Sequence, residues 1–119
     1  MTLPAISEDN PWIILFFLLS AHFFGDYVFQ SEFLALGKNP TKPLPNTPYW
    51  WPLTAHSWVH ACLVMIVVWD LRAAALEFVT HWLIDYSKCS GKFNNYKVSA
   101  FTIDQVLHIL VMIAIFLVF

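Results

Sequence analysis

Hydrophobic residues are gathered into four long segments, and short polar stretches separate them. The first segment is strongly apolar from Trp12 and becomes amphipathic up to about Leu36. The segments approach the length of about 20 residues that an α-helix needs to cross the hydrocarbon core of a bilayer. The pattern therefore predicts four helices, at about 12–36, 53–69, 73–88 and 100–119.

The polar stretches predict where these helices end. Residues 37–52 begin with Gly37, which can close a helix, and contain five prolines, so we expect a loop there. Only residues 69–72 separate the second and third segments. One continuous helix would be about 50 Å long, against about 30 Å for the bilayer core, so a tight hairpin is the better prediction.

The last loop is predicted at residues 88–99, which are mostly polar. Ser99 or Thr102 is the expected N-cap of the fourth helix. Thr102 and Gln105 also fit a capping box, so we expect Gln105 to cap this helix rather than to take part in a site.

The composition indicates that these helices lie in a membrane. Of the 119 residues, 59% are hydrophobic and 12% are charged, and the mean hydropathy is +0.62. Soluble domains contain about 25% charged residues. We therefore expect an all-α integral membrane protein, in which residues 1–119 form a single transmembrane domain, an antiparallel four-helix bundle. The net charge of -2, without a basic stripe, argues against nucleic acid as a partner.

The basic residues predict the orientation of this bundle. The first loop contains two lysines and the third contains three, whereas the opposite side of the predicted membrane has Arg72 alone. The positive-inside rule therefore puts the first and third loops in the cytoplasm and both chain termini outside it.

Each histidine has an aspartate or another histidine four residues away, within an apolar segment. The pairs are His22/Asp26, His56/His60, His81/Asp85 and Asp104/His108. This spacing puts both side chains on one helix face, near enough to bind one metal ion. With five histidines and five aspartates, a given histidine has such a partner by chance about one time in six. Because these groups are costly in hydrocarbon, the pairs indicate a function.

In the predicted topology all four pairs lie at one depth, near the cytoplasmic ends of the helices. A shallow layer contains Asp26, His56, Asp85 and Asp104, and a layer about 6 Å deeper contains His22, His60, His81 and His108. Mixed nitrogen and oxygen donors suit Zn, Mn or Fe, and eight candidate ligands suit two ions, or one ion with outer partners. The alternative is a set of hydrogen-bonded contacts that stabilise helix packing.

Other residues near the pairs extend the candidate site. Glu77 lies four residues before His81, and Glu77 and Asp85 are the candidate catalytic residues, although Glu77 could instead bond a neighbouring helix. Lys88, three residues after Asp85, could pair with it or meet an anionic substrate; a cytoplasmic loop lysine is the more ordinary interpretation. Gly25 predicts a close approach between helices.

Four stretches carry a family resemblance: AHFFGDYVFQ, HSWVH, THWLIDYSK and FTIDQVLH. They resemble a bacterial and phage-encoded domain-of-unknown-function family of small four-helix inner-membrane proteins, with the motifs H-x-x-G-D-[FY]-x-x-Q, T-H-x-x-[IV]-D-x-x-K and D-Q-x-x-H. The resemblance implies a four-span protein of the bacterial inner membrane and no established reaction. It supports six family positions: His22, Asp26, His81, Asp85, Asp104 and His108. A looser similarity to membrane-bound metal-dependent hydrolases rests on the style of the motifs alone.

The leading hypothesis is a membrane-embedded metalloprotein with two ions that hydrolyses a lipid-like or phosphorylated substrate from the cytoplasmic leaflet. Zinc, manganese or iron would activate water, with Glu77 or Asp85 as the general base. The alternatives are a metal-ion or proton transporter that uses the same residues, a haem protein with histidine ligands, and a structural or assembly subunit. Membrane lipids are the expected partners, and a small apolar chain of this kind can form a homo-oligomer.

Overall fold

The protein is all-helical, as the hydrophobic pattern predicts, in a computed structural model that describes residues 10–119. Within this range there is no β-strand, and a short π-helical segment follows the first helix. The elements are α2 (Trp12–Phe23), η1 (Phe24–Val28), α3 (Glu32–Gly37), α4 (Trp50–Val68), α5 (Leu71–Cys89) and α6 (Ala100–Val118).

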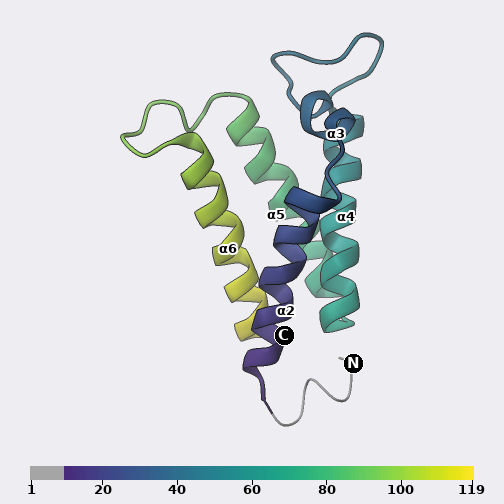
Figure 1. Ribbon diagram of the computed structural model, residues 1–119, viewed down its shortest axis with the longest axis vertical. Coiled ribbons are helices and arrows are strands. Elements are labelled where there is room, and N and C mark those ends of the chain that lie inside the picture. Colours follow the sequence, from purple (N-terminus) through teal and green to yellow (C-terminus); the bar gives the residue numbers. More distant parts are fainter. Residues whose placement is uncertain (1–9) are drawn as a thin grey trace.

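The four long helices lie side by side and alternate in direction (Figure 1). Helix α2 packs against α4 and α6, and α5 packs against the same two helices, so the four surround a common interior. Loops 38–49 and 90–99 lie at one end of the molecule together with α3, and we call this the loop end (Figure 1). The tight turn between α4 and α5 and the C-terminus lie at the other end, the turn end.

The prediction of one continuous helix over 12–36 is wrong. The Phe29 N–H donates to the Phe24 carbonyl, five residues back, at 2.8 Å, and this widened turn ends the first helix. Ser31 is then extended and caps α3, because its hydroxyl accepts a hydrogen bond from the Leu34 N–H at 3.3 Å. The chain therefore changes direction just after Asp26, and α3 runs separately against α4.

Helix α4 begins at Trp50, three residues earlier than predicted from the proline-rich stretch. The prediction that residues up to 52 are non-helical is wrong at this boundary. Pro52 lies in the first turn, where the backbone N–H has no acceptor within the helix, so a proline costs nothing there.

The predicted hairpin between the second and third segments is present. Trp69 ends α4 in the left-handed conformation, with φ 57°. Asp70 is extended and caps α5, where its carboxylate accepts a hydrogen bond from the Arg72 N–H at 2.8 Å. Because Asp70 is the N-cap, α5 begins at the next residue, Leu71, which is two residues before the predicted start.

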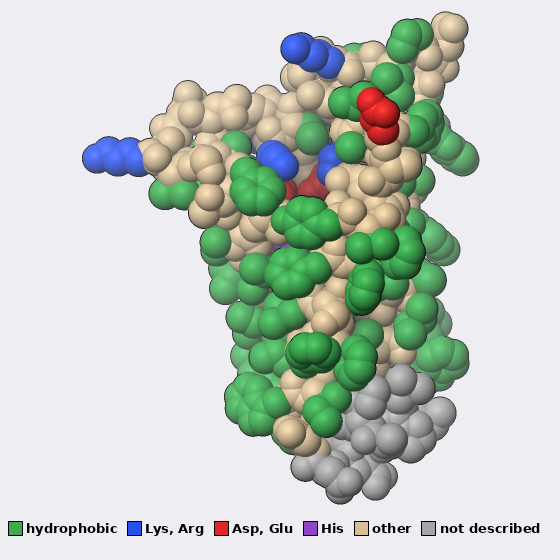
Figure 2. All heavy atoms as spheres, in the orientation of Figure 1, with side chains coloured by type: hydrophobic (Ala, Val, Ile, Leu, Met, Phe, Trp, Pro, Cys, Tyr) green, Lys and Arg blue, Asp and Glu red, His purple; other side chains and the backbone are tan. Residues whose placement is uncertain are grey.

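Many polar residues are buried and many large apolar residues are exposed, unlike the distribution in a typical soluble domain. The turn-end half has an apolar core of Leu18, Val64, Val68, Ala73, Met112 and Ile115, whereas the loop-end half has a buried polar interior. Large hydrophobic side chains cover much of the outer surface (Figure 2). Helices α4 and α6 are each long and apolar enough to cross a membrane, and α2 with η1 forms a shorter apolar stretch.

Candidate metal centre

The structure brings the eight predicted ligands together, with Glu77, in the interior between the middle of the bundle and the loop end. We call the five histidines with Asp26, Glu77, Asp85 and Asp104 the polar cluster. All five imidazoles are at most 1% exposed. Neighbouring rings are close: the centroids of His60 and His81 are 3.7 Å apart, and those of His81 and His108 are 4.1 Å apart. The i,i+4 pairs thus come from α2 with η1, α4, α5 and α6 and meet in one place.

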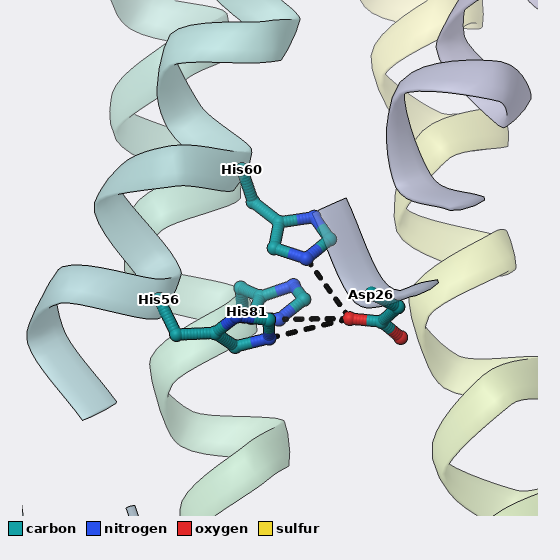
Figure 3. A group of neighbouring side chains, drawn as sticks. All are labelled: Asp26, His56, His60 and His81. Carbon is teal, nitrogen blue, oxygen red and sulfur yellow. Dashed lines mark hydrogen bonds and ion pairs between the residues drawn. The ribbon is translucent and has the colours of Figure 1, made fainter. Parts of the chain in front are cut away.

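Asp26 is the centre of the first group of candidate ligands (Figure 3). Its Oδ1 lies 2.9 Å from His60 Nε2, 3.3 Å from His56 Nε2 and 3.8 Å from His81 Nε2. All four ligand atoms lie within 4.8 Å of one another, and they come from η1, α4 and α5. Two ligands each about 2.1 Å from one tetrahedral ion lie about 3.4 Å apart, so these spacings suit a shared ion.

Asp85 forms a second group with His81 and His108. Its Oδ1 is 2.9 Å from His108 Nε2, and its Oδ2 is 3.4 Å from His81 Nε2. The same oxygen is also 3.4 Å from His56 Nε2, which belongs to the first group. His81 is common to both groups, so the two groups adjoin each other.

Two predicted ligands lie beside these groups rather than within them. His22 Nε2 is 3.0 Å from Gln105 Oε1 and 3.5 Å from Asp26 Oδ2. Asp104 Oδ1 is 3.3 Å from His108 Nε2. Both can serve as outer partners, or as ligands after small side-chain shifts.

Glu77 lies on the far side of the histidines from the two aspartates. Its Oε2 is 3.7 Å from His60 Nδ1 and 4.0 Å from His81 Nδ1, whereas the aspartates approach the Nε2 atoms. A carboxylate on Nδ1 favours the tautomer that protonates this nitrogen and leaves Nε2 free to bind a metal.

Several buried nitrogens of the cluster have no hydrogen-bond partner within the described residues. They include both ring nitrogens of His56 and of His81. Buried polar groups normally have a partner. Unpaired imidazole nitrogens that converge with carboxylate oxygens form a donor set that could hold a metal ion.

Gly25 permits a close approach between η1 and α4, as its position in the sequence predicts. A Cβ atom at this residue would fall within 2.8 Å of several atoms of the His60 ring. Because Gly25 has no side chain, the His60 ring can lie close to η1 and reach Asp26, the residue that follows Gly25.

Sequence reasoning missed Gln105, and its prediction as a cap is wrong. Ser99 caps α6, and Gln105 Nε2 donates to Asp26 Oδ2 at 3.0 Å and to Asp104 Oδ2 at 3.1 Å. A signal was present, because Gln105 precedes His108 by three residues and shares its helix face.

Sequence reasoning also missed Lys38, which it treated as a loop lysine. Lys38 Nζ donates to Asp85 Oδ2 at 3.0 Å, and the residue is 9% exposed. Burial opposes the charge, but the Asp85 carboxylate outweighs this effect and holds the pKa of Lys38 above its ordinary value. Lys38 follows α3 in a loop, where no helical spacing connects it to the histidines, so the sequence carried no signal for this contact.

These features define a helical protein with a buried cluster of histidines and carboxylates at one end. The chain belongs to the family described as "Protein of unknown function (DUF3307)", whose model matches residues 14–119 and so includes the whole polar cluster. This confirms the predicted membership of a domain-of-unknown-function family. No curated protein and no solved structure gives a significant match to the chain.

Proposed function

We propose that the chain is an integral membrane protein in which α2 with η1, α4, α5 and α6 cross the bilayer as an antiparallel four-helix bundle. The apolar exterior and the polar interior support this proposal, since lipid-facing surfaces are apolar and ionisable residues in membranes face the interior. The loop end carries five lysines and the turn end Arg72, which favours a cytoplasmic loop end and extracytoplasmic termini. The proposed location is the bacterial inner membrane.

The proposed function is that of a metal-dependent protein with two divalent transition-metal ions, zinc, manganese or iron. One ion would be held by Asp26, His56 and His60, and the other by Asp85 and His108, with His81 between them. The single observation that carries this proposal is the convergence of the unpaired Nε2 atoms of His56 and His81 with carboxylate oxygens at spacings near 3.4 Å.

The proposed reaction is hydrolysis of a lipid-like or phosphorylated substrate that arrives from the cytoplasmic leaflet. Asp26, Asp85 and Asp104 lie within four residues of the loop-end ends of η1, α5 and α6, so a substrate that enters from the cytoplasmic leaflet in the proposed orientation would meet these carboxylates first. A divalent ion there would lower the pKa of a coordinated water and polarise the bond to be broken. Because the Glu77 carboxylate faces the Nδ1 atoms of His60 and His81 at 3.7 and 4.0 Å, its geometry favours a role in positioning these two rings. Asp104, which belongs to neither proposed ligand set, is then the better candidate for the general base.

The first test is the metal content of the detergent-purified protein, measured by elemental analysis. We expect about two transition-metal ions per chain. His81→Ala removes a ligand common to both groups and should lose at least half of the metal. Thr80→Ala is the matched control, because its hydroxyl bonds the carbonyl of Leu76 in the same helix. The proposal fails if the wild-type protein binds no stoichiometric metal, or if His81→Ala keeps its full content.

Release of inorganic phosphate from phosphatidic acid in vesicles tests the reaction itself. The metal-loaded protein should release phosphate, and Asp85→Asn should reduce the rate by about 100-fold or more, as expected for loss of a metal ligand. Equal rates in both proteins would exclude Asp85 from the chemistry.

The interruption of the first helix favours a second candidate function, transport of a metal ion or proton. Asp26 lies in a π-helical segment that is followed by the break at 29–31, and π-helical turns and broken helices frequently carry ion sites. Uptake of zinc into proteoliposomes, lost in Asp26→Asn and accompanied by no phosphate release, would favour transport over hydrolysis.

A further inference from the structure

Two lysines approach the polar cluster from the loop end. Lys38 extends from the end of α3 to Asp85, and Lys88 extends from the last turn of α5 to Asp104, where Nζ and Oδ2 are 3.8 Å apart. The surface is hollowed at this end, and basic side chains stand there in front of acidic ones (Figure 2). The cluster is thus covered by two ammonium groups on the side that faces the loops.

Both lysines have hydrogen-bonding capacity left. An ammonium group has three N–H donors, and Lys38 uses one of them on Asp85. The distance from Lys88 to Asp104 exceeds that of a hydrogen bond, and the Lys88 side chain is 32% exposed. The remaining donors can therefore bind an anion that enters from the loop end.

The formal charges also favour an anionic ligand. Four carboxylates and two ammonium groups leave the cluster with two uncompensated negative charges when the imidazoles are neutral. Two divalent ions would reverse this to two positive charges. A buried site tolerates net charge poorly, so a ligand with about two negative charges completes the balance, as a phosphate monoester does.

We propose that Lys38 and Lys88 bind the phosphoryl group of the substrate at the loop-end entrance of the site. This inference rests on the proposed metal centre, because the ions supply the positive charge that attracts the anion. A lysine ammonium binds phosphate as a point charge, without a fixed orientation, and its side chain is flexible. Two lysines on separate elements can therefore both reach one phosphoryl group. The phosphoryl group belongs either to a phospholipid headgroup or to a water-soluble phosphate.

The other loop lysines provide matched controls. Lys42 and Lys97 are exposed on the two loops, and Lys92 lies over the ring of Tyr86. A general attraction between a basic surface and anions would involve all of these lysines. Specific binding involves, among the loop-end lysines, only Lys38 and Lys88.

The test measures binding of inorganic phosphate to the full-length, metal-loaded protein in nanodiscs by isothermal titration calorimetry. Lys38→Met and Lys88→Met should each weaken phosphate binding about tenfold, the effect of one charge-assisted hydrogen bond. Lys42→Met and Lys97→Met should change the affinity less than about twofold. Lys88 is partly exposed, so Lys88→Met keeps the test decisive even where loss of the buried Lys38 impairs folding.

Metal content, measured on the same samples, separates the possible failures. Protein without metal contradicts the proposed function, whereas full metal content with unchanged phosphate affinity in Lys38→Met and Lys88→Met overturns this inference alone. Nanodiscs with and without phosphatidic acid identify the source of the anion. Competition between this lipid and inorganic phosphate indicates a lipid headgroup, and phosphate binding without competition indicates a soluble phosphate; both results support a phosphoryl site at these lysines.

Discussion

At the scale of single residues, the close contact between Gly25 and the His60 ring controls how two elements meet. Both residues are buried, and the ring is held on its other side by His81 and Glu77. A larger residue at position 25 must therefore displace either the ring or the backbone of η1. In either case the contact of 2.9 Å between His60 and Asp26 is lost.

Gly25→Ala should destabilise the protein and weaken metal binding. Alanine favours helix by about 1 kcal/mol over glycine, but overpacking costs about 1–3 kcal/mol, so the clash outweighs the helix propensity. Unfolding by denaturant in detergent measures this effect.

A double-mutant cycle tests whether the clash with the His60 ring causes the loss of stability in Gly25→Ala. In a His60→Ala background the ring is absent, so Gly25→Ala should cost less than it does in the wild-type protein. Equal costs in the two backgrounds would place the origin of the effect elsewhere.

The i,i+4 rule predicted the members of the site because it describes a single helix. Each pair shares a face whatever its helix packs against. The same rule extended to i,i+3 would have identified Gln105 through His108. Lys38 lies in a loop, and its contact with Asp85 depends on a chain path that local spacing does not describe.

At the scale of the elements, the caps decide where the helices begin. Asp70 separates α4 from α5, and its carboxylate bonds both the backbone and the side chain of Arg72. These hydrogen bonds lower the pKa of Asp70 to about 2 from an ordinary value of 3.8. The ionised form is thus favoured in the folded protein.

This pKa predicts an acid-sensitive contribution to stability. Because the folded-state pKa is below the unfolded one, the stabilisation is fully present above about pH 4 and is lost as the pH falls towards 2. Asp70→Asn keeps a capping oxygen but does not titrate. Thermal unfolding should show the wild-type protein more stable than Asp70→Asn at pH 6, with the difference disappearing near pH 2. A difference that is independent of pH would contradict the role of the ionised carboxylate.

The element boundaries show where local signals were insufficient. The turn at Trp69–Asp70 was predicted from the length of a bilayer, with no glycine or proline to mark it. The break after Val28 was not predicted, because no proline marks it and the polar residues Gln30, Ser31 and Glu32 are also compatible with a continuing amphipathic helix. This break lies where η1 and α3 both pack on α4, so tertiary packing compensates for the interrupted helix.

At the scale of the whole molecule, the polar cluster links all four long helices. Its carboxylates repel one another, and the two lysines offset only half of their formal charge. An ion bound between the helices would supply the remaining compensation and join them together. Metal binding and stability are therefore expected to be coupled.

Removal of metal by a chelator should lower the melting temperature of the purified protein. Free metal at 100 times its Kd stabilises the folded state by about 2.7 kcal/mol. Zinc or manganese should restore the melting temperature, whereas magnesium and calcium should not, because imidazole nitrogens are poor ligands for both. An Asp26→Asn variant provides the control, since it lacks a ligand and should respond less to added zinc. A melting temperature unaffected by both chelator and zinc would contradict a structural contribution of metal.

The sequence by itself determined the helical character, the four long helices and the i,i+4 pairs, because each depends on the residues within one segment. The tertiary structure decided which pairs share an oxygen, which nitrogen of each histidine faces the aspartates, and that Lys38 and Gln105 join the cluster. These contacts join residues far apart in the chain, up to 83 positions for His22 and Gln105. Their distances follow from how the helices pack and where the first helix breaks, and local spacing contains neither.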